Sequence, residues 1–292
     1  MEKTVFDNID PDMLERIRAM RLFDDELMSL VFSGNIEVTQ LLIRILLNRN
    51  DLTVTKSMTQ IQKTNLFGKS VKLDVVAEDI FKTEYNIEIQ RAGSGAGARR
   101  IRYHQAMLDS HTLNKGGKFK DLPNLFIIFM LEEDLFGKGN PVYRVKKILD
   151  IKDEYGNYLP FDDDCNIMYV NGEYRGDDPL GKLMHDFSTA NADEMYFKEL
   201  ADKMRFFKQD EEGVQMASKI VEEYGDIRAA EALKQGIQQG IQQGIQQGIQ
   251  QKAEEDAMKM LIEGDSPEKV SRCIDLPLEK VLELQKRITV KP

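Results

Sequence analysis

The chain has 292 residues, of which 41% are hydrophobic and 31% are charged, and its formal net charge is −10. These proportions are typical of an ordinary globular protein and exclude a disordered or membrane-embedded chain. The acidic balance also excludes a protein that binds nucleic acid through a uniformly basic surface. The longest apolar run, LFIIFML, is far too short to span a bilayer and no secretory leader is recognisable, so we expect a cytoplasmic protein.

The first half of the chain alternates between helical and strand patterns. Apolar residues at helical spacing predict one or two helices over residues 8–33, and a helix capped near Ser33 or Asn35 follows, with Glu37 in its first turn. A glycine-rich bend, AGSGAGA, opens a helix over residues 98–114. Strands are expected over residues 52–57, 71–78, 85–91, 124–131 and 142–149. This order of elements predicts an α/β fold, a mixed sheet flanked by helices.

The chain is expected to be helical from about residue 178 onward, and it contains an internal repeat. Four copies of GIQQ fill residues 236–251, which places Ile237, Ile241, Ile245 and Ile249 in one stripe along a helix, beside a stripe of glycines. Four interior glycines cost about 4 kcal/mol of intrinsic helix propensity, so a stable helix here needs a partner, and self-association is one interpretation. A flexible spacer is the other.

The strands over residues 71–78 and 85–91 are expected to form a hairpin with one polar face. If paired positions sum to an even number, Lys72, Asp74, Glu88 and Gln90 share that face, opposite Ile87 and its apolar neighbours. The Cβ atoms of Asp74 and Glu88 are then about 5 to 8 Å apart, a separation at which two carboxylates repel unless a cation lies between them. The simpler interpretation is a polar face that meets water.

A hard divalent cation such as Mg²⁺, or Mn²⁺ in its place, suits two carboxylates, and Glu37 could add a third if its helix packs beside the hairpin. Such a metal could polarise a phosphodiester and activate a water molecule. Gln90 could orient that water, and Lys72 could stabilise developing charge.

A basic run follows the hairpin directly. Between Arg91 and Lys120 there are seven lysines and arginines and one acid, Asp109. Arg99, Arg100 and Arg102 lie near the N-terminus of the predicted helix, where guanidinium groups, the helix dipole and free backbone amides can bind phosphates together. A solvated helix face is the alternative.

Cysteines and histidines predict no further site. Cys165 and Cys273 lie more than a hundred residues apart, which does not favour a disulfide framework. His104 and His111 are two helical turns apart, longer than the one-turn spacing usual for a pair of metal ligands.

Six segments, in this order, resemble the PD-(D/E)XK nuclease superfamily and, more closely, its bacterial branch of PD-(D/E)XK nuclease family transposases, or recombination-promoting (Rpn-like) nucleases. The resemblance spans roughly residues 27–240. Its segments are VFSGNIEVTQLLIRILL, VKLDVVAED, YNIEIQR, RRIRYHQAMLDSHTLNKGGKFKDLPNLFIIFM, DLFGKGNPVYR and NIMYVNGEYRGDDPLGKLMHDF.

The resemblance implies a Mg²⁺-dependent DNA endonuclease with a restriction-endonuclease-like mixed sheet, active in transposition or recombination. By position, Asp74 and Glu88 match the two metal-binding acids, and Glu37 matches an acid of the first helix. Gln90 stands where the wider superfamily has lysine, which is common in this branch and leaves transition-state stabilisation unassigned. The side chains expected to contact DNA are Arg91, Arg99, Arg100, Arg102 and Tyr103.

The same reasoning divides the chain into a nuclease-like domain with N-terminal helices (1–210), a helical Gln-rich linker with the GIQQ repeats (211–252) and a small helical unit (253–292), with homo-oligomers formed through the repeat. A helix-turn-helix is one interpretation of the last unit, and a plain helical cap is another. The alternative function is a catalytically degenerate nuclease relative that binds DNA or a protein as an oligomeric module. A third possibility is a plain α/β protein whose hairpin face is only solvated.

Overall fold

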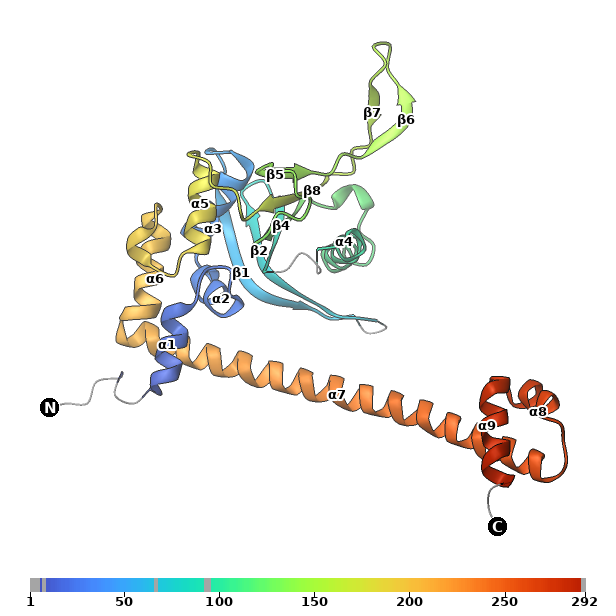
Figure 1. Cartoon of the computed structure of the whole chain (residues 1–292). Helices are drawn as coiled ribbons and strands as arrows, with labels where there is room; N and C mark the ends of the chain where they lie inside the picture. Colours follow the sequence, from blue (N-terminus) through green and yellow to red (C-terminus); the bar gives the residue numbers. More distant parts are fainter. Residues whose placement is uncertain (1–5, 7–8, 66–67, 92–95, 290–292) are drawn as a thin grey trace. The chain divides into compact units, whose positions relative to one another are not determined.

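A six-stranded mixed sheet lies at the centre of the N-terminal part of the chain (Figure 1). The structure, a computed structural model, describes residues 6, 9–65, 68–91 and 96–289. In spatial order the strands are β1 (Val54–Lys63), β2 (Val71–Asp79), β3 (Glu84–Gln90), β4 (Leu125–Leu131), β8 (Cys165–Asn171) and β5 (Val142–Arg144). β4 pairs in parallel with β3 and β8, and the other pairs are antiparallel. The predicted α/β class, a mixed sheet with flanking helices, is confirmed.

Helices cover both faces of the sheet unequally (Figure 1). One face packs against α1 (Pro11–Ala19), α2 (Asp25–Phe32), α3 (Ile36–Leu47), α5 (Pro179–Ser188), α6 (Lys198–Gln209) and the first turns of α7 (Glu211–Ile262). On the other face, α4 (Ala98–Thr112) is the helix that contributes to the buried cluster among the described residues. The short 3₁₀ turns η3 (Phe119–Asp121) and η4 (Ala192–Glu194) lie in the connections.

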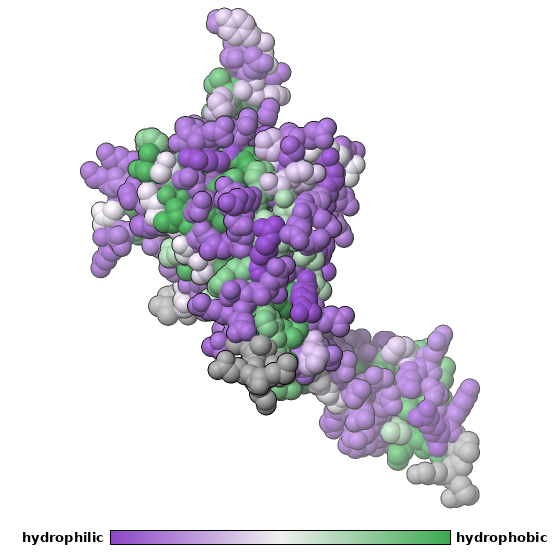
Figure 2. Space-filling view, turned by 90° about the vertical axis from the view of Figure 1, so that its left-hand side faces the viewer, coloured by the Kyte–Doolittle hydropathy of each residue, from purple (hydrophilic) through white to green (hydrophobic). Residues whose placement is uncertain are grey.

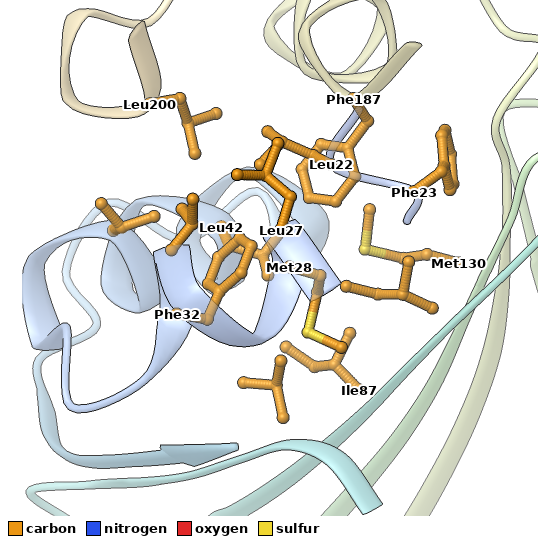
Figure 3. Close-up of a cluster of buried hydrophobic side chains, with 14 of the residues drawn as sticks. Leu22, Phe23, Leu27, Met28, Phe32, Leu42, Ile87, Met130, Phe187 and Leu200 are labelled. Carbon is orange, nitrogen blue, oxygen red and sulfur yellow. The ribbon is translucent and has the colours of Figure 1, made fainter. Parts of the chain in front are cut away.

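The larger hydrophobic core fills the space between the sheet and the helices of the first face. Figure 3 shows Phe32, Leu27 and Met28 of α2 beside Ile87 of β3. The rings of Phe23 and Phe187 meet edge to face, with their centroids 5.5 Å apart. Tyr85, Ile87 and Ile89 all belong to this core, as the alternation of the sequence predicted. β3 is therefore held firmly through one face.

The central strand β4 is apolar along its whole length because both of its faces are covered. Ile128 and Met130 point into the larger core, whereas Ile127 and Phe129 point into the smaller core under α4. Glu88 of β3 is paired with Phe129 in the sheet register. The even-numbered side chains of β3 are thus directed toward α4, which positions the candidate site.

Three features of the sheet differ from the sequence-based expectation. The first is β8, which was not among the expected strands. β1 continues to Lys63, well past the predicted end at residue 57. The strand expected over residues 142–149 ends at Arg144, and a new strand, β6 (Ile148–Lys152), pairs outside the main sheet with β7 (Tyr158–Pro160). At the base of this second sheet, Lys147 binds Asp163 at 2.7 Å and the carbonyl of Cys165 at 3.1 Å, which fixes the point where the chain leaves the main sheet.

Contacts divide the chain into two compact units, Met1–Glu222 and Glu223–Pro292. The GIQQ repeats lie within α7, and the isoleucines of the repeat are each more than half exposed. The end of α7 packs with α8 (Pro267–Ile274) and α9 (Leu278–Thr289) around a small core of Ala257, Val270, Val281 and Leu284. Within the repeat, a Cβ atom added at any of the four glycines would meet no atom within 4 Å.

Both cysteines are free thiols. No single helix in the described ranges is both long enough and apolar enough to cross a membrane. Taken together, α2 and α3 meet the criteria of length and composition, and they are bent by 109° at their junction.

The repeat generates a prediction that separates its two interpretations. We expect the fourfold variant G236A/G240A/G244A/G248A to raise helix content, because each alanine removes about 1 kcal/mol of unfavourable helix propensity. If another backbone packs closely on the glycine stripe, the added methyl groups also weaken self-association. Circular dichroism and light scattering measure the two effects on the same sample.

Deletion of residues 232–252 should likewise change the oligomeric state while leaving the first unit folded. If neither change alters the number of chains per particle, self-association through the repeat is contradicted and the spacer interpretation is favoured.

Candidate active site

The middle of the polar face of β3 does not meet water. Asn86 and Glu88 are both fully buried, and they lie on the side of the sheet that α4 covers. An isolated ionised carboxylate in such a place would be strongly unfavourable, so Glu88 requires partners. Both side-chain polar atoms of Asn86 and the Oε1 atom of Glu88 have no hydrogen-bond partner among the described residues. A buried polar layer therefore separates β3 from α4.

The first two turns of α4 supply the partners of Glu88. Arg100 donates from a terminal guanidinium nitrogen to Oε2 of Glu88 at 3.0 Å. The Nδ1 atom of buried His104 lies 3.5 Å from Oε1 of Glu88. The Nε group of Arg100 also donates to Nε2 of His104 at 3.2 Å. Because Nε2 accepts this bond, the proton of a neutral His104 sits on Nδ1 and faces Glu88.

Gln90 joins the same network through Arg100. In the amide orientation that satisfies both of its polar atoms, the Gln90 oxygen accepts from the two terminal nitrogens of Arg100 at 2.9 and 2.5 Å. The guanidinium carbon of Arg100 also lies 5.9 Å from the centroid of the Phe129 ring. One arginine thus contacts three predicted or newly found site residues, Glu88, Gln90 and His104.

Asp74 lies where the β2–β3 ladder ends. The pairs run from Glu78 opposite Glu84 to Val75 opposite Ile87. In a regular continuation the amide of Ile89 would donate to the carbonyl of Leu73. It donates instead to Oδ2 of Asp74 at 3.0 Å. The carboxylate takes the place of a backbone acceptor at the point where the two strands separate.

The β1–β2 ladder is interrupted at the same position. Thr59 pairs with Val75 and Ile61 with Leu73, but Gln60, which the register places opposite Asp74, has a positive φ of 54°. Its side-chain amide points at Oδ1 of Asp74 from 3.5 Å. A glutamine in the left-handed region is strained, and such strain is concentrated at functional sites.

The environment of Asp74 favours its protonated form. Burial and the nearby charge of Glu88 raise the pKa of Asp74 to about 8, and the bond from the Ile89 amide and the charge of Arg100 only partly oppose this rise. The two acids are therefore close enough to interact electrostatically, as the shared hairpin face predicted.

A third acid, which was not among the predicted metal ligands, lies near the pair. Asp25, in the first turn of α2, is close enough to contribute to the raised pKa of Asp74. Glu37 is exposed in the first turn of α3, which packs along β1 near Val54 and Ser57, several residues away from Gln60. The sequence signal for Asp25 is an acid that opens an apolar helix, which is also what an ordinary helix start contains.

The residues predicted to contact DNA have different surroundings. Arg99 and Arg102 are exposed on α4, and Lys72 is exposed on β2 two residues before Asp74. Arg91 is paired with Asp24 at 3.0 Å and with Glu132 at 3.4 Å. Of the predicted glycine-rich bend before α4, residues 92–95 lie outside the described residues.

Tyr103 is occupied by contacts within the protein. Its hydroxyl donates to the carbonyl of Lys69 at 2.5 Å and accepts from Asn65 at 3.0 Å, which anchors α4 to the segment between β1 and β2. Tyr103 therefore holds the helix in place beside the acids, and this role in the fold accounts for its position.

The donor set fits a cation that needs few protein ligands. Over the described ranges, no group of three or more His, Cys, Asp or Glu side chains is arranged to hold a metal ion. Mg²⁺, however, is commonly bound by one or two carboxylates and keeps several waters. The Oε1 atom of Glu88 accepts no hydrogen bond from the described residues and has the Nδ1 atom of His104 3.5 Å away. This atom and the carboxylate of Asp74 match that requirement.

The raised pKa of Asp74 predicts an unusual stability profile. Between about pH 4 and pH 8 the folded chain holds a proton on Asp74 that the unfolded chain has lost, so this group lowers stability as the pH rises through that range. We expect Asp74→Asn to raise the melting temperature at pH 8 and to have little effect at pH 4. A stabilisation of about 1 kcal/mol corresponds to about 2–4 °C for a domain of this size.

Asp79→Asn is the matched control for this measurement. Asp79 lies on the same strand, but it accepts bonds from the amides of Phe81 and Thr83 and from the Tyr85 hydroxyl. Its substitution should lower the melting temperature at both pH values. Equal losses of stability for the two variants would show that Asp74 is ionised in the folded protein.

Comparisons with family models, curated proteins and solved structures gave no match to this chain.

Proposed function

We propose that this protein is a metal-dependent DNA endonuclease with a restriction-endonuclease-like core of the PD-(D/E)XK type, active in the cytoplasm in transposition or recombination. The observation that carries the proposal is that the register of two neighbouring strands brings the acids Asp74 and Glu88 together beside the basic start of α4. The resemblance described from the sequence gives this pair its reaction class.

Asp74 and Glu88 are the proposed metal ligands, and Asp25 is better placed than Glu37 to add a third carboxylate. Bound Mg²⁺ or Mn²⁺ would supply Lewis-acid activation of the phosphodiester and of the attacking water. Ionisation of Asp74 would accompany binding, because a carboxylate with a pKa of about 8 is mostly protonated at neutral pH.

Arg100 is the proposed source of the positive charge that Gln90 cannot provide. Its guanidinium lies between Glu88 and Gln90, at the centre of the polar layer. A fixed cation in such a place can stabilise the charge that develops on a phosphate in the transition state. Gln90 then orients Arg100 in addition to any contact with water, and Lys72 remains a second candidate cation at the edge of the site.

DNA is the proposed substrate because exposed cations continue from the site along α4. Arg99 and Arg102 are exposed close to the helix N-terminus at Gly97, where backbone amides and the helix dipole add to their attraction for phosphate. Arg91 contributes less, since Asp24 and Glu132 already neutralise it.

The Arg100–Glu88 ion pair also supports a second candidate function. A guanidinium on Glu88 competes with a metal for the same carboxylate, as expected in a degenerate relative that binds DNA or protein without cleaving it. The two candidates differ in what removal of Arg100 does.

We expect the wild-type chain to nick supercoiled plasmid in the presence of Mg²⁺ or Mn²⁺, and Glu88→Gln to reduce the rate by at least about 100-fold, because one of two metal ligands is lost. Glu78→Gln is the matched control: Glu78 lies on β2 but pairs with Lys56 and Lys82 at the surface. Its activity should equal that of the wild type.

The rate of the wild type should rise with pH through about pH 8, as Asp74 loses its proton. An absence of cleavage under every metal tried, with DNA binding intact, would support the binding module instead.

Arg100→Gln provides a separate test. In a nuclease this change should lower the cleavage rate by roughly 10- to 1,000-fold, as expected for a lost electrostatic stabiliser, while calorimetry shows metal binding that is unchanged or tighter. If the wild type does not cleave DNA and Arg100→Gln both binds metal more tightly and cleaves, Arg100 prevents metal binding at Glu88 in the wild type.

A further inference from the structure

The β1–β2 pair continues past the end of its pairing with β3, and its far part lies against α4 (Figure 1). This far part, residues 60–65 and 68–74, is termed the ribbon. The hydroxyl of Tyr103 donates to the carbonyl of Lys69 at 2.5 Å and accepts from the side chain of Asn65 at 3.0 Å. The ribbon and α4 are therefore fixed to each other and form one surface.

The ribbon turns over near Asp74. Val75 and Ala77 of β2 belong to the larger core. Val71 and Leu73 of the same strand belong to the smaller core under α4. Along a regular strand these odd-numbered side chains would all lie on one face of the sheet, so the strand changes its facing where both ladders are interrupted. As a result, the ribbon lies on the side of the sheet that α4 covers, which is also the side of the candidate site.

The ribbon carries lysines and no acid ahead of Asp74. Residues 52–73 contain four lysines and no aspartate or glutamate, although the whole chain has 50 acids and 40 lysines and arginines. Lys69 and Lys72 are exposed. Lys72 points away from α4, because side chains alternate along β2 and its two neighbours in the strand are the ones packed under the helix. The ribbon therefore presents positive charge to solvent.

The cations of the ribbon lie next to those of α4. Arg99 is one helical turn before Tyr103, on the side of the helix that contacts Lys69. Arg102 adjoins Tyr103 in the sequence and is also exposed. The first acid of α4 is Asp109, in its last turns. The exposed positive charge thus continues from α4 onto the ribbon without an intervening acid of either element.

These cations border the two acids of the candidate site. Lys72 is two residues before Asp74 on β2. Arg99 directly precedes Arg100, which binds Glu88 at 3.0 Å. A phosphodiester placed at the two acids would therefore have exposed cations on both elements to bind its neighbouring phosphates.

We propose that the ribbon is a second phosphate-binding element of the DNA site, in which Lys69 and Lys72 bind phosphates of the duplex that Arg99 and Arg102 contact on α4. The identity of the polymer rests on the proposed function. Lysine side chains bind phosphate as compact point charges and phosphate contacts carry no sequence information, so the ribbon adds affinity for DNA of any sequence. A polymer that is charged at every step fits cations spread over two elements, which favours DNA over a short acidic segment of a protein.

The salt dependence of DNA binding by the full chain tests the proposal. Fluorescence anisotropy with a labelled duplex, in buffer containing EDTA, measures the association constant while no strand is cut. The logarithm of this constant falls with the logarithm of the salt concentration by about 0.9 for each phosphate contact. We expect this slope to be less steep by about 1 for Lys69→Ala and by about 2 for Lys69→Ala/Lys72→Ala, on duplexes of any sequence.

Lys203→Ala is the matched control. Lys203 is exposed on α6, which packs on the other face of the sheet and lies on the side of the first unit that is turned toward the viewer in Figure 2. The variant loses the same charge as Lys69→Ala, and its slope should equal that of the wild type.

The outcomes separate this inference from the proposed function. Wild-type slopes for both ribbon variants, or an equal change in Lys203→Ala, would overturn the ribbon as a phosphate-binding element even if the chain cleaves DNA. Less steep slopes for the ribbon variants in a chain that never cleaves would uphold the element and contradict the nuclease. A wild type that binds no duplex would overturn both. Polyglutamate bound through Lys69 as tightly as the duplex would assign the ribbon to an acidic protein instead.

Discussion

The buried carboxylate of Glu88 is the constraint around which the site is built. A strand in the middle of a sheet buries this acid between the sheet and α4, next to the apolar residues Ile127 and Phe129. Such an acid is tolerable only with a hydrogen-bonded cation close by, and Arg100 provides it at 3.0 Å. The positions of His104 and Gln90 follow, because both bind the same guanidinium. The docking of α4 on the sheet and the chemistry of the site thus have one physical origin.

Much of this arrangement was predictable from the sequence, for a simple reason. Side chains alternate strictly along a strand, so YNIEIQR already implied that Ile87 and Ile89 share one environment and Glu88 and Gln90 the other. The same rule brought Asp74 near Glu88 once the hairpin was recognised. Asn35 was one of two caps expected for α3, and its side chain accepts from the amide of Val38. These features depend on local periodicity, which one sequence contains in full.

The remaining features depend on tertiary contacts that have no local pattern. Arg100 looked like its exposed neighbours Arg99 and Arg102, yet the helical rotation turns it toward Glu88. Asp25 approaches Asp74 only because α2 packs on β1 and β2, whereas Glu37 has the same place in a helix that lies farther along β1. The small sheet of β6 and β7 was not predicted, because residues 142–149 were expected to form one strand. A bond from Lys147 to Asp163 instead redirects the chain between β5 and β6.

The β1–β2 and β2–β3 ladders are both interrupted at Asp74, so the backbone that carries Asp74 is held less rigidly than the backbone that carries Glu88. Glu88 belongs to a strand paired with β4 through its whole length, while residues 71–73 are paired with β1 alone. Local opening needs the least free energy where backbone hydrogen bonds are fewest. The part of the β1–β2 pair that contains residues 71–73 can therefore open without disturbing the parallel strands. A ligand bound by both acids would therefore also order this part of the β1–β2 pair. Some of the binding free energy would be used for that ordering, which would be seen as slower amide hydrogen exchange in β1 and would not add to the affinity.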